Sequence, residues 1–517
     1  MSRSPEQRWR RSQEYLAQGQ SAPARAQLEA LQVQSPRFVG THLLASRIAW
    51  QEDRIRDATR HAIEALHVVP DDPALLCEVV ETLLLVGEVV AARDCLAHPV
   101  LRQATACEWL LRLADFRQQL NENVESLALI ERATIAGATG PDVEFHHGVQ
   151  LYFNGRMREA ESALEASLRV VPENGRAALT LSRLRSQTQQ ASHLGQLDKG
   201  LARVAKGSRA HAALEFARYK ELEDLERCDE AWQALATGNA VMRARNAFDA
   251  DSQVAFLDRL VAALGANCLR GPSAQPDGPQ PIFVIGLARS GTTVLERMLG
   301  NHPQVESAGE LVDFGAQLQW AADTRDTHGD AYLARLPDLD LAELGRRYLA
   351  QTRWRAHGKP CFIDKQPPNW ELAGLIHAAL PQAKILHMVR DPMDVCFSNW
   401  RAFFGDTYGY SYDLAALAAY YRGYRRLMAH WHRLMPGVIM DVPYAHLVRD
   451  PEATMRKVFE HCELAWEPCC VDMQRNRVPV ATLSAAQVRQ PVHARAFGQW
   501  QRYAEWLAPL RDALGRP

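Results

Sequence analysis

Three positions in the first half of the chain recur every 34 residues, and this period restricts the possible fold more than any other feature. A turn-forming residue stands at Gly19, Asp53, Gly87, Asn121 and Gly155. A small residue follows five positions later, at Ala24, Ala58, Ala92, Ser126 and Ala160. The spacings between Pro36, Pro70 and Pro172 are one and three periods. Glycine, Asp and Asn suit a turn between two helices, the small residue lets the helices pack closely, and proline ends the second helix.

This pattern resembles tetratricopeptide repeats, which stack helix pairs into an α-solenoid. The register fails beyond residue 176, where the polar segment 181–200 is interpreted as a helix end or a loop. A further helical pair is expected over 213–245, as a cap of the array. We therefore predict a repeat array with its cap over 1–265, a Gly- and Pro-rich linker over 266–280, and a second domain over 281–517. The array either holds an acceptor peptide or protein on its concave surface, or only scaffolds or dimerises the chain, as a homodimer.

The second domain opens with PIFVIGLARSGTTVLERMLGNHPQVESAGE, residues 281–310. Its apolar, β-branched start predicts a buried parallel strand, Gly286 and Gly291 bound a loop, and a helix follows. Unpaired N–H groups and the helix dipole make such a loop an anion site. The spacing is that of a nucleotide P-loop, but Thr292 replaces the lysine and Arg289 supplies the cation. The alternative is an ordinary glycine-rich strand–helix turn.

Two further strand–helix units follow the loop. The segments 360–365 and 384–390 predict strands, which end at Lys365 and Arg390. Each is followed by a helical segment, over 369–380 and 391–403. Such alternation predicts an α/β domain with a P-loop-like parallel sheet. Ligands bind beyond the carboxyl ends of such strands, so Arg289, Lys365 and Arg390 are expected to converge there.

The sequence RSGTT after a strand, with a glutamate about twenty residues later, resembles the 5′-phosphosulfate loop of PAPS-dependent sulfotransferases. The resemblance covers 281–517 and is greatest to the tyrosylprotein sulfotransferase branch, in a bacterial version fused to tetratricopeptide repeats. It implies PAPS as donor, PAP as product and no metal. It assigns the 5′-phosphosulfate to Arg289, Ser290, Gly291, Thr292 and Thr293, and the 3′-phosphate to Arg390 and Ser398. The residue-level alternative for Arg390 is an ion pair with Asp391 or Asp394.

The same resemblance assigns the catalytic roles. Glu310 matches the general base, and Lys365 matches the lysine that stabilises charge on the leaving oxygen, with Arg289 and Ser484 also assisting the transition state. Tyr444 and Arg489 match cofactor contacts, although strict alignment puts Gln490 at the second position. The family's further arginine is replaced by Ala402, with Arg401 one place early. From the residues alone, Glu310 could be a capping or surface glutamate, and Asp364 could be the structural partner of Lys365.

The acceptor is much less determined than the donor. We expect a sulfotransferase acting on a peptidyl tyrosine or another hydroxyl. The alternatives are a small-molecule, lipid or glycan hydroxyl, for which the aromatic side chains of 403–412 could form a platform, and an inactive repeat scaffold. A kinase or GTPase is disfavoured because the P-loop lysine is missing.

Composition excludes other classes of partner. The net charge of −2 gives no bulk basicity for nucleic acid. The first residues lack the apolar stretch of a secretory signal, and no apolar run is long enough for a membrane span. The ten cysteines form no CxxC pair, so we expect reduced thiols and a cytoplasmic protein. The triplet His430 to His432 is interpreted as a solvated helix surface rather than a metal site.

Overall fold

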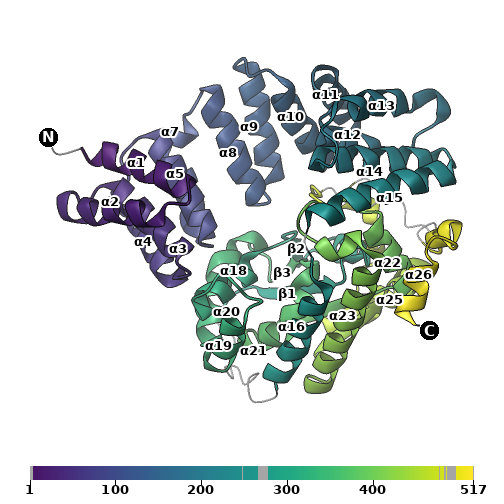
Figure 1. Cartoon of the computed structure of the whole chain (residues 1–517). Helices are drawn as coiled ribbons and strands as arrows, with labels where there is room; N and C mark the ends of the chain where they lie inside the picture. The colour runs from purple at the N-terminus through teal and green to yellow at the C-terminus, as the bar shows by residue number, and fades with distance from the viewer. Residues whose placement is uncertain are drawn as a thin grey trace.

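The computed structural model describes residues 4–246, 248–265, 277–476, 478–482, 485 and 497–515. A helical array forms the first half and arches over an α/β domain, as Figure 1 shows. Its helices are α1 (Pro5–Ala17), α2 (Ser21–Gln34), α3 (Val39–Gln51), α4 (Ile55–Val68), α5 (Pro73–Leu85), α6 (Val89–Leu96), α7 (Pro99–Arg102), α8 (Cys107–Gln119), α9 (Asn123–Ile135), α10 (Pro141–Phe153), α11 (Met157–Val170), α12 (Gly175–Arg183), α13 (Leu194–Arg203), α14 (Arg209–Asp224), α15 (Cys228–Arg245) and α16 (Ala250–Ala263). None of the described helices is long and apolar enough to cross a membrane.

The 34-residue register has the predicted geometry. All five turn residues adopt positive φ: Gly19 at 71°, Asp53 at 61°, Gly87 at 77°, Asn121 at 61° and Gly155 at 82°. The small residues five positions later are buried, with exposed fractions of 0–1%. The α-solenoid fold class is therefore confirmed, because a left-handed turn followed by a tightly packed small residue defines each helix pair.

The array continues past the end of the sequence register. Glu226, with φ 58°, turns the chain between α14 and α15, and the completely buried Ala231 follows five positions later. This pair repeats the turn geometry of the earlier units with a shifted register. The interpretation of 181–200 as a helix end or loop is wrong for α13, whose Leu197 and Leu201 are buried against the array core. Polar residues on its other face concealed this short amphipathic helix.

The second domain is built on a five-stranded parallel sheet in the order β2-β3-β1-β4-β5. Its strands are β1 (Gln280–Gly286), β2 (Val305–Ser307), β3 (Cys361–Asp364), β4 (Lys384–Val389) and β5 (Ile439–Pro443). Its helices are α17 (Thr292–Leu299), α18 (Asp313–Ala322), α19 (Asp330–Arg335), α20 (Leu341–Thr352), α21 (Ala373–Ala379), α22 (Pro392–Trp400), α23 (Leu414–Leu434), α24 (Tyr444–Arg449), α25 (Pro451–His461) and α26 (Ala508–Leu514). The predicted parallel α/β sheet is confirmed; β2 is an additional edge strand that the sequence did not reveal, because it is only three residues long.

Alternate residues of β1 pack into two separate cores, as the pleat of a strand requires. Phe283 and Ile285 join the core that contains α18, α20 and α23. Ile282 and Val284 join the core that contains α17, α24 and α25. Helices cover both faces, so the sheet is buried and its carboxyl edge is left as the natural ligand site.

The last helix before the sheet packs on the α/β domain. Leu257 of α16 lies against Gly423 of α23, and Arg426 pairs with Asp258 at 2.8 Å. His430 is buried and its Nε2 lies 2.8 Å from the Leu264 carbonyl oxygen. The interpretation of the His430–His432 triplet as a solvated surface is therefore wrong for His430 and for the completely buried Trp431, whereas His432 is partly exposed. The predicted boundary at 265 remains a prediction, but α16 contacts the second domain.

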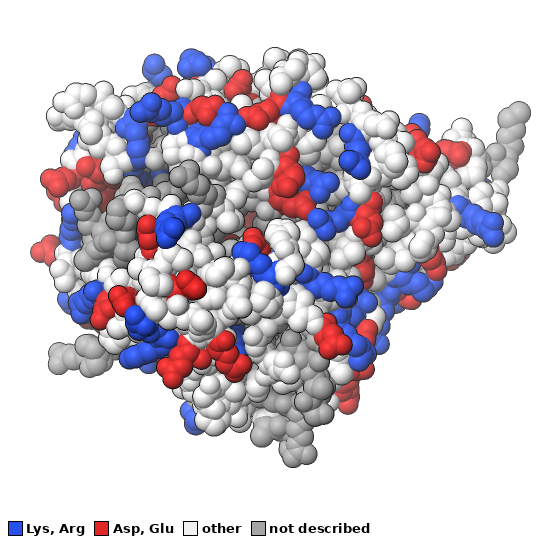
Figure 2. Space-filling view, turned by 180° about the vertical axis from the view of Figure 1, so that it is seen from behind, with Lys and Arg blue, Asp and Glu red and all other residues white. Residues whose placement is uncertain are grey.

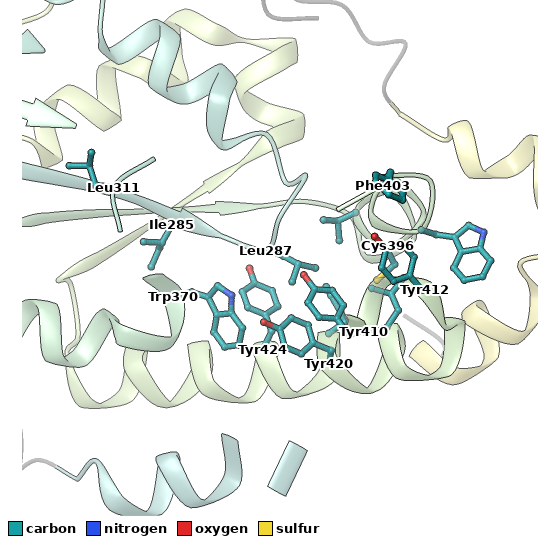
Figure 3. Close-up of a cluster of buried hydrophobic side chains, with 14 of the residues drawn as sticks. Ile285, Leu287, Leu311, Trp370, Cys396, Phe403, Tyr410, Tyr412, Tyr420 and Tyr424 are labelled. Atoms are coloured by element: carbon teal, nitrogen blue, oxygen red, sulfur yellow. The ribbon is translucent and has the colours of Figure 1, made fainter. Parts of the chain in front are cut away.

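The aromatic segment 403–412 forms a core more than a surface platform. Tyr410 stacks on Tyr420 of α23 with ring centroids 3.8 Å apart, and Figure 3 shows both within the buried cluster. Tyr412 accepts a hydrogen bond from the Phe404 amide and donates one to the Gly405 carbonyl, both at 2.9 Å. Phe404 and Tyr408 are only half-buried, so these two side chains remain as candidates for contact with an acceptor.

Ala231→Leu tests whether α14 and α15 form a further close-packed repeat unit. Overpacking a buried alanine should lower the free energy of unfolding by about 1–3 kcal/mol. Ala240→Leu is the matched control, because Ala240 is exposed on the same helix. Thermal unfolding followed by circular dichroism measures both variants, and equal midpoints would contradict the packing role of Ala231.

Candidate active site

The loop after β1 is shaped by two glycines that no other residue could replace. Gly286 has φ 147° and Gly291 has φ 109°, conformations that side chains disfavour. A Cβ on Gly286 would lie 2.8 Å from the Met388 carbonyl oxygen, and one on Gly291 would lie 2.5 Å from Tyr444. Arg289 also adopts positive φ, at 68°. The loop therefore curls tightly around the N-terminus of α17, which is the geometry of an anion cradle.

The residues predicted to line this cradle lie together. Ser290, Thr292 and Thr293 are buried at the start of α17. The Ser290 hydroxyl has no hydrogen-bond partner among the described residues, although it is fully enclosed. A buried hydroxyl usually has a partner, so its position in the cradle fits a phosphate or sulfate oxygen.

Arg390 joins the cradle from the end of β4. Its Nη1 donates to the Arg289 carbonyl oxygen at 3.0 Å, and its guanidinium lies 4.9 Å from the centroid of the Tyr444 ring. Asp391 caps α22 through the Asp394 amide, while Asp394 accepts from the Gly498 amide at 2.8 Å. Both carboxylates also act on Arg390, because burial lowers its pKa while Tyr444, Asp394 and Asp391 oppose the fall.

Helix α22 is tied to the same loop. Asn399 donates to the Ala288 carbonyl oxygen at 2.7 Å, and its neighbour Ser398 is buried in the helix. Arg401, the residue one place early in the motif, instead pairs with Glu223 of α14 at 3.3 Å. Although burial opposes it, Glu223 raises the pKa of Arg401. Arg401 therefore connects the site to the repeat array.

A cluster of four arginines surrounds the cradle. Burial, and then repulsion from Arg401, Arg183 and Arg390, lowers the pKa of Arg289 to about 9. Arg183 ends α12, so the array contributes to the positive field at the loop. A bound polyanion relieves the repulsion among cations that lie close together. The planar guanidinium group also matches the geometry of phosphate and sulfate oxygens, so this cluster suits such a ligand. Sequence reasoning missed Arg183, because nothing in its repeat marks it as different.

Lys365 and Glu310 meet at the carboxyl end of β3. Lys365 is completely buried, and its Nζ donates to Glu310 Oε1. Its second carboxylate neighbour is Glu296 Oε2, at 3.8 Å. Glu310 keeps 42% of its side chain exposed, so one end of this pair is open to an acceptor. A paired cation and carboxylate of this kind can stabilise developing negative charge and remove a proton.

The neighbouring acids have different partners. Asp364 is completely buried and accepts a hydrogen bond from the Tyr348 hydroxyl at 2.9 Å, so it is not the counter-ion of Lys365. Glu296 accepts from the Ser307 hydroxyl at 2.6 Å. Burial raises the pKa of Glu296, with Lys365 opposing the rise. Glu296, from α17, is a site residue that the sequence did not mark.

Two predicted site residues, Ser484 and Arg489, lie outside the described residues, as does the alternative Gln490. Tyr444 lies beside the loop as expected, with the Phe497 ring centroid 5.6 Å from its own.

On the face shown in Figure 2, acidic and basic side chains are interspersed, in line with the net charge of −2. No disulfide joins the described cysteines.

Gly291→Ala tests the cradle. The added Cβ is strained at φ 109° and overlaps Tyr444, so PAP binding should weaken by more than about tenfold, which corresponds to about 1.4 kcal/mol. Gly315→Ala in α18 is the matched control, since a Cβ there would meet no atom within 4 Å. Calorimetric titration measures both, and wild-type affinity in the Gly291 variant would contradict a cradle role.

Comparison with known proteins agrees with this geometry. Residues 281–468 match the sulfotransferase family. This segment is therefore a sulfotransferase-family domain, and it contains the cradle, Glu310, Lys365 and Arg390. It is joined to an array of the tetratricopeptide type.

Curated relatives share about a quarter of the aligned residues. An uncharacterized protein of Aquifex aeolicus is 28% identical over 367 residues, covering 69% of this chain and 48% of that protein. A protein-tyrosine sulfotransferase of Drosophila melanogaster is 26% identical over 266 residues, covering 45% of this chain and 51% of that protein. The chain thus spans about half the length of these relatives.

Two solved structures are each similar to part of the chain. A sulfotransferase domain from the Synechococcus PCC 7002 olefin synthase has a TM-score of 0.30 and 19% identity, covering 46% of this chain and 97% of that one. A tetratricopeptide repeat protein from Parabacteroides merdae has a TM-score of 0.35 and 13% identity, covering 46% of this chain and 93% of that one.

Proposed function

We propose that this protein is a PAPS-dependent sulfotransferase that transfers a sulfuryl group to an acceptor hydroxyl. The observation that carries the proposal is the meeting of two features at one sheet edge. An arginine-rich anion cradle follows β1 and β4, and the Glu310–Lys365 pair lies at the end of β3 next to β1. The sulfotransferase-family match over 281–468 supports the reaction class. Donor binding needs no metal, because the cradle supplies its own cations.

The site residues divide the work of the reaction. The backbone of 286–293 with Arg289, Arg390 and Ser398 holds the phosphates of the donor. Glu310 accepts the acceptor's proton as the new O–S bond forms, which an un-ionised phenol with a reference pKa of about 10 requires. Lys365, buried beside it, stabilises the negative charge that develops on the leaving phosphate oxygen. PAP then leaves with the bond electrons, and the sulfate ester remains on the acceptor.

The acceptor we favour is a tyrosine in a peptide or protein. Tyr408 is half-buried in the 403–412 loop, and burial, and then the Glu310 carboxylate, raises the pKa of its hydroxyl. The same loop is linked to the array, because Arg209 of α14 pairs with Asp406 at 3.3 Å. Similarity to the Drosophila protein-tyrosine sulfotransferase supports this choice.

The array also carries charged side chains of its own. Arg176 of α12 is exposed and lies 4.7 Å from the centroid of the Phe145 ring of α10. Burial raises the pKa of Asp115 of α8, and the nearby His146 and Arg176 oppose the rise. These groups on three successive repeats could contact the residues that flank an acceptor tyrosine. A small-molecule acceptor is the second candidate, because the half-buried rings of Phe404 and Tyr408, with centroids 4.9 Å apart, offer an aromatic contact for a small acceptor.

Two substitutions should separate chemistry from donor binding. Glu310→Gln should lower kcat by about 10²–10⁴-fold with PAP affinity within a few-fold, because a general base contacts the acceptor's proton. Arg390→Ala should weaken PAP binding by about 2–4 kcal/mol, because it removes a charged phosphate contact. Transfer of labelled sulfate and calorimetry with PAP in EDTA measure the two effects. Full turnover by the Glu310 variant would contradict its assignment as base, and a requirement for Mg²⁺ would contradict the donor.

Arg176→Ala should separate peptide from small-molecule acceptors. A peptide long enough to reach the array loses one charged contact, so its kcat/KM should fall by about fivefold, whereas a small phenol should be unaffected. Arg158→Ala, which removes an exposed arginine from α11, is the control. Competition between a tyrosine peptide and a phenol in one reaction measures the ratio, and an unchanged ratio would favour the small-molecule alternative.

A further inference from the structure

The turns of three successive repeats dock onto one segment of the α/β domain, residues 308–325. Each docking group comes from the left-handed turn position of its repeat. These positions are Asp53, Gly87 and Asn121. Asp53 accepts hydrogen bonds from the Arg325 amide at 2.6 Å and from the Thr324 hydroxyl at 2.7 Å. The Gly87 carbonyl oxygen accepts one from the Gln317 side chain at 2.9 Å. The Asn121 side chain donates to the carbonyl oxygens of Glu310, at 2.9 Å, and Ala308, at 3.4 Å. Turn residues that are 34 positions apart thus contact successive parts of residues 308–325.

Asn121 holds the main chain on both sides of Gly309. Its amide group spans the carbonyl oxygens of Ala308 and Glu310, across a glycine with φ 79°. The opposite side is held by β3, because the Lys365 amide donates to the Gly309 carbonyl oxygen at 2.9 Å. Residues 308–310 are therefore fixed between the sheet and a repeat turn.

The side chain of Glu310 has little other support. Its carboxylate contacts Lys365 but is 42% exposed, so packing alone does not hold it. A general base must lie within hydrogen-bond reach of the proton it removes. A displacement of about 1 Å can cost about 10²-fold in rate, so the anchoring of its backbone matters for catalysis.

We propose that Asn121 is a positioning residue that fixes Glu310 for catalysis, so that the repeat array is part of the catalytic unit. This inference rests on the proposed function. It differs from a role of the array in acceptor capture, because the effect of Asn121 passes through Glu310 and is the same for every acceptor.

The chain itself supplies the substitution for the test. Gly19, Gly87 and Gly155 occupy the position equivalent to Asn121, so Asn121→Gly keeps the turn and removes only the amide group. We expect kcat to fall by about tenfold for both a peptide and a phenol acceptor, with PAP affinity and KM within about twofold. Asp53→Gly is the matched control, because it removes the equivalent contact to Thr324 and Arg325, away from the base, and should leave kcat within about twofold.

A double-mutant cycle distinguishes positioning from general damage. In a Glu310→Ala background, Asn121→Gly should scarcely change the residual rate, because the group it positions is gone. An equal loss in both backgrounds, or wild-type kcat in the single variant, would overturn the inference.

If the unmodified chain neither binds PAP nor transfers sulfate, the proposed function fails. Hydrogen exchange of the 308–312 amides then still tests the anchoring: it should be faster in Asn121→Gly than in Asp53→Gly, and equal exchange overturns it.

Discussion

Docking of the repeat turns onto the α/β domain is the interaction on which the rest of the structure depends. The turn contacts use main-chain atoms and buried charges, and they add to an apolar core that is continuous between the halves, where Phe216 packs on Phe403 and Trp232 stacks on Trp400. Arg355 donates to the Leu120 carbonyl oxygen at 2.7 Å, and Glu88 is buried between Arg347 and Gln351. Buried polar groups must be satisfied, so each such contact fixes the register of the array against the domain. The two halves therefore pack on each other as one unit.

This docking gives the site two walls with different origins. The sheet edge supplies the anion cradle, Lys365 and Glu310, all from strand ends and the loops that follow them. The array supplies Arg183 to the positive field around Arg289 and Glu223 as counter-ion of Arg401. The resemblance puts an arginine where this chain has Ala402, and the arginine here stands one position earlier, at Arg401. The Arg401 guanidinium pairs with Glu223 of the array, which gives a physical reason for the altered motif.

Local patterns predicted most of the architecture. The strands that end at Lys365 and Arg390 were identified because buried parallel strands are short, continuous apolar runs. The turn residues were identified because positive φ selects Gly, Asn and Asp. Patterns failed where contacts across the fold decide the state. Helix α13 looks polar until its leucines meet the array, and His430 looks solvated until α16 covers it.

The sequence alone indicated the candidate site: an arginine-bearing P-loop variant, followed by a glutamate, a lysine and a second arginine. Those features are local, because a tight loop and the end of a strand depend on the residues within them. Only the tertiary structure decided which groups act together. Asn121 is one turn residue among five in the repeat, and it reaches Glu310 across 189 positions of the chain. No periodicity within the array encodes that contact, since it arises from how two separately patterned halves pack on each other.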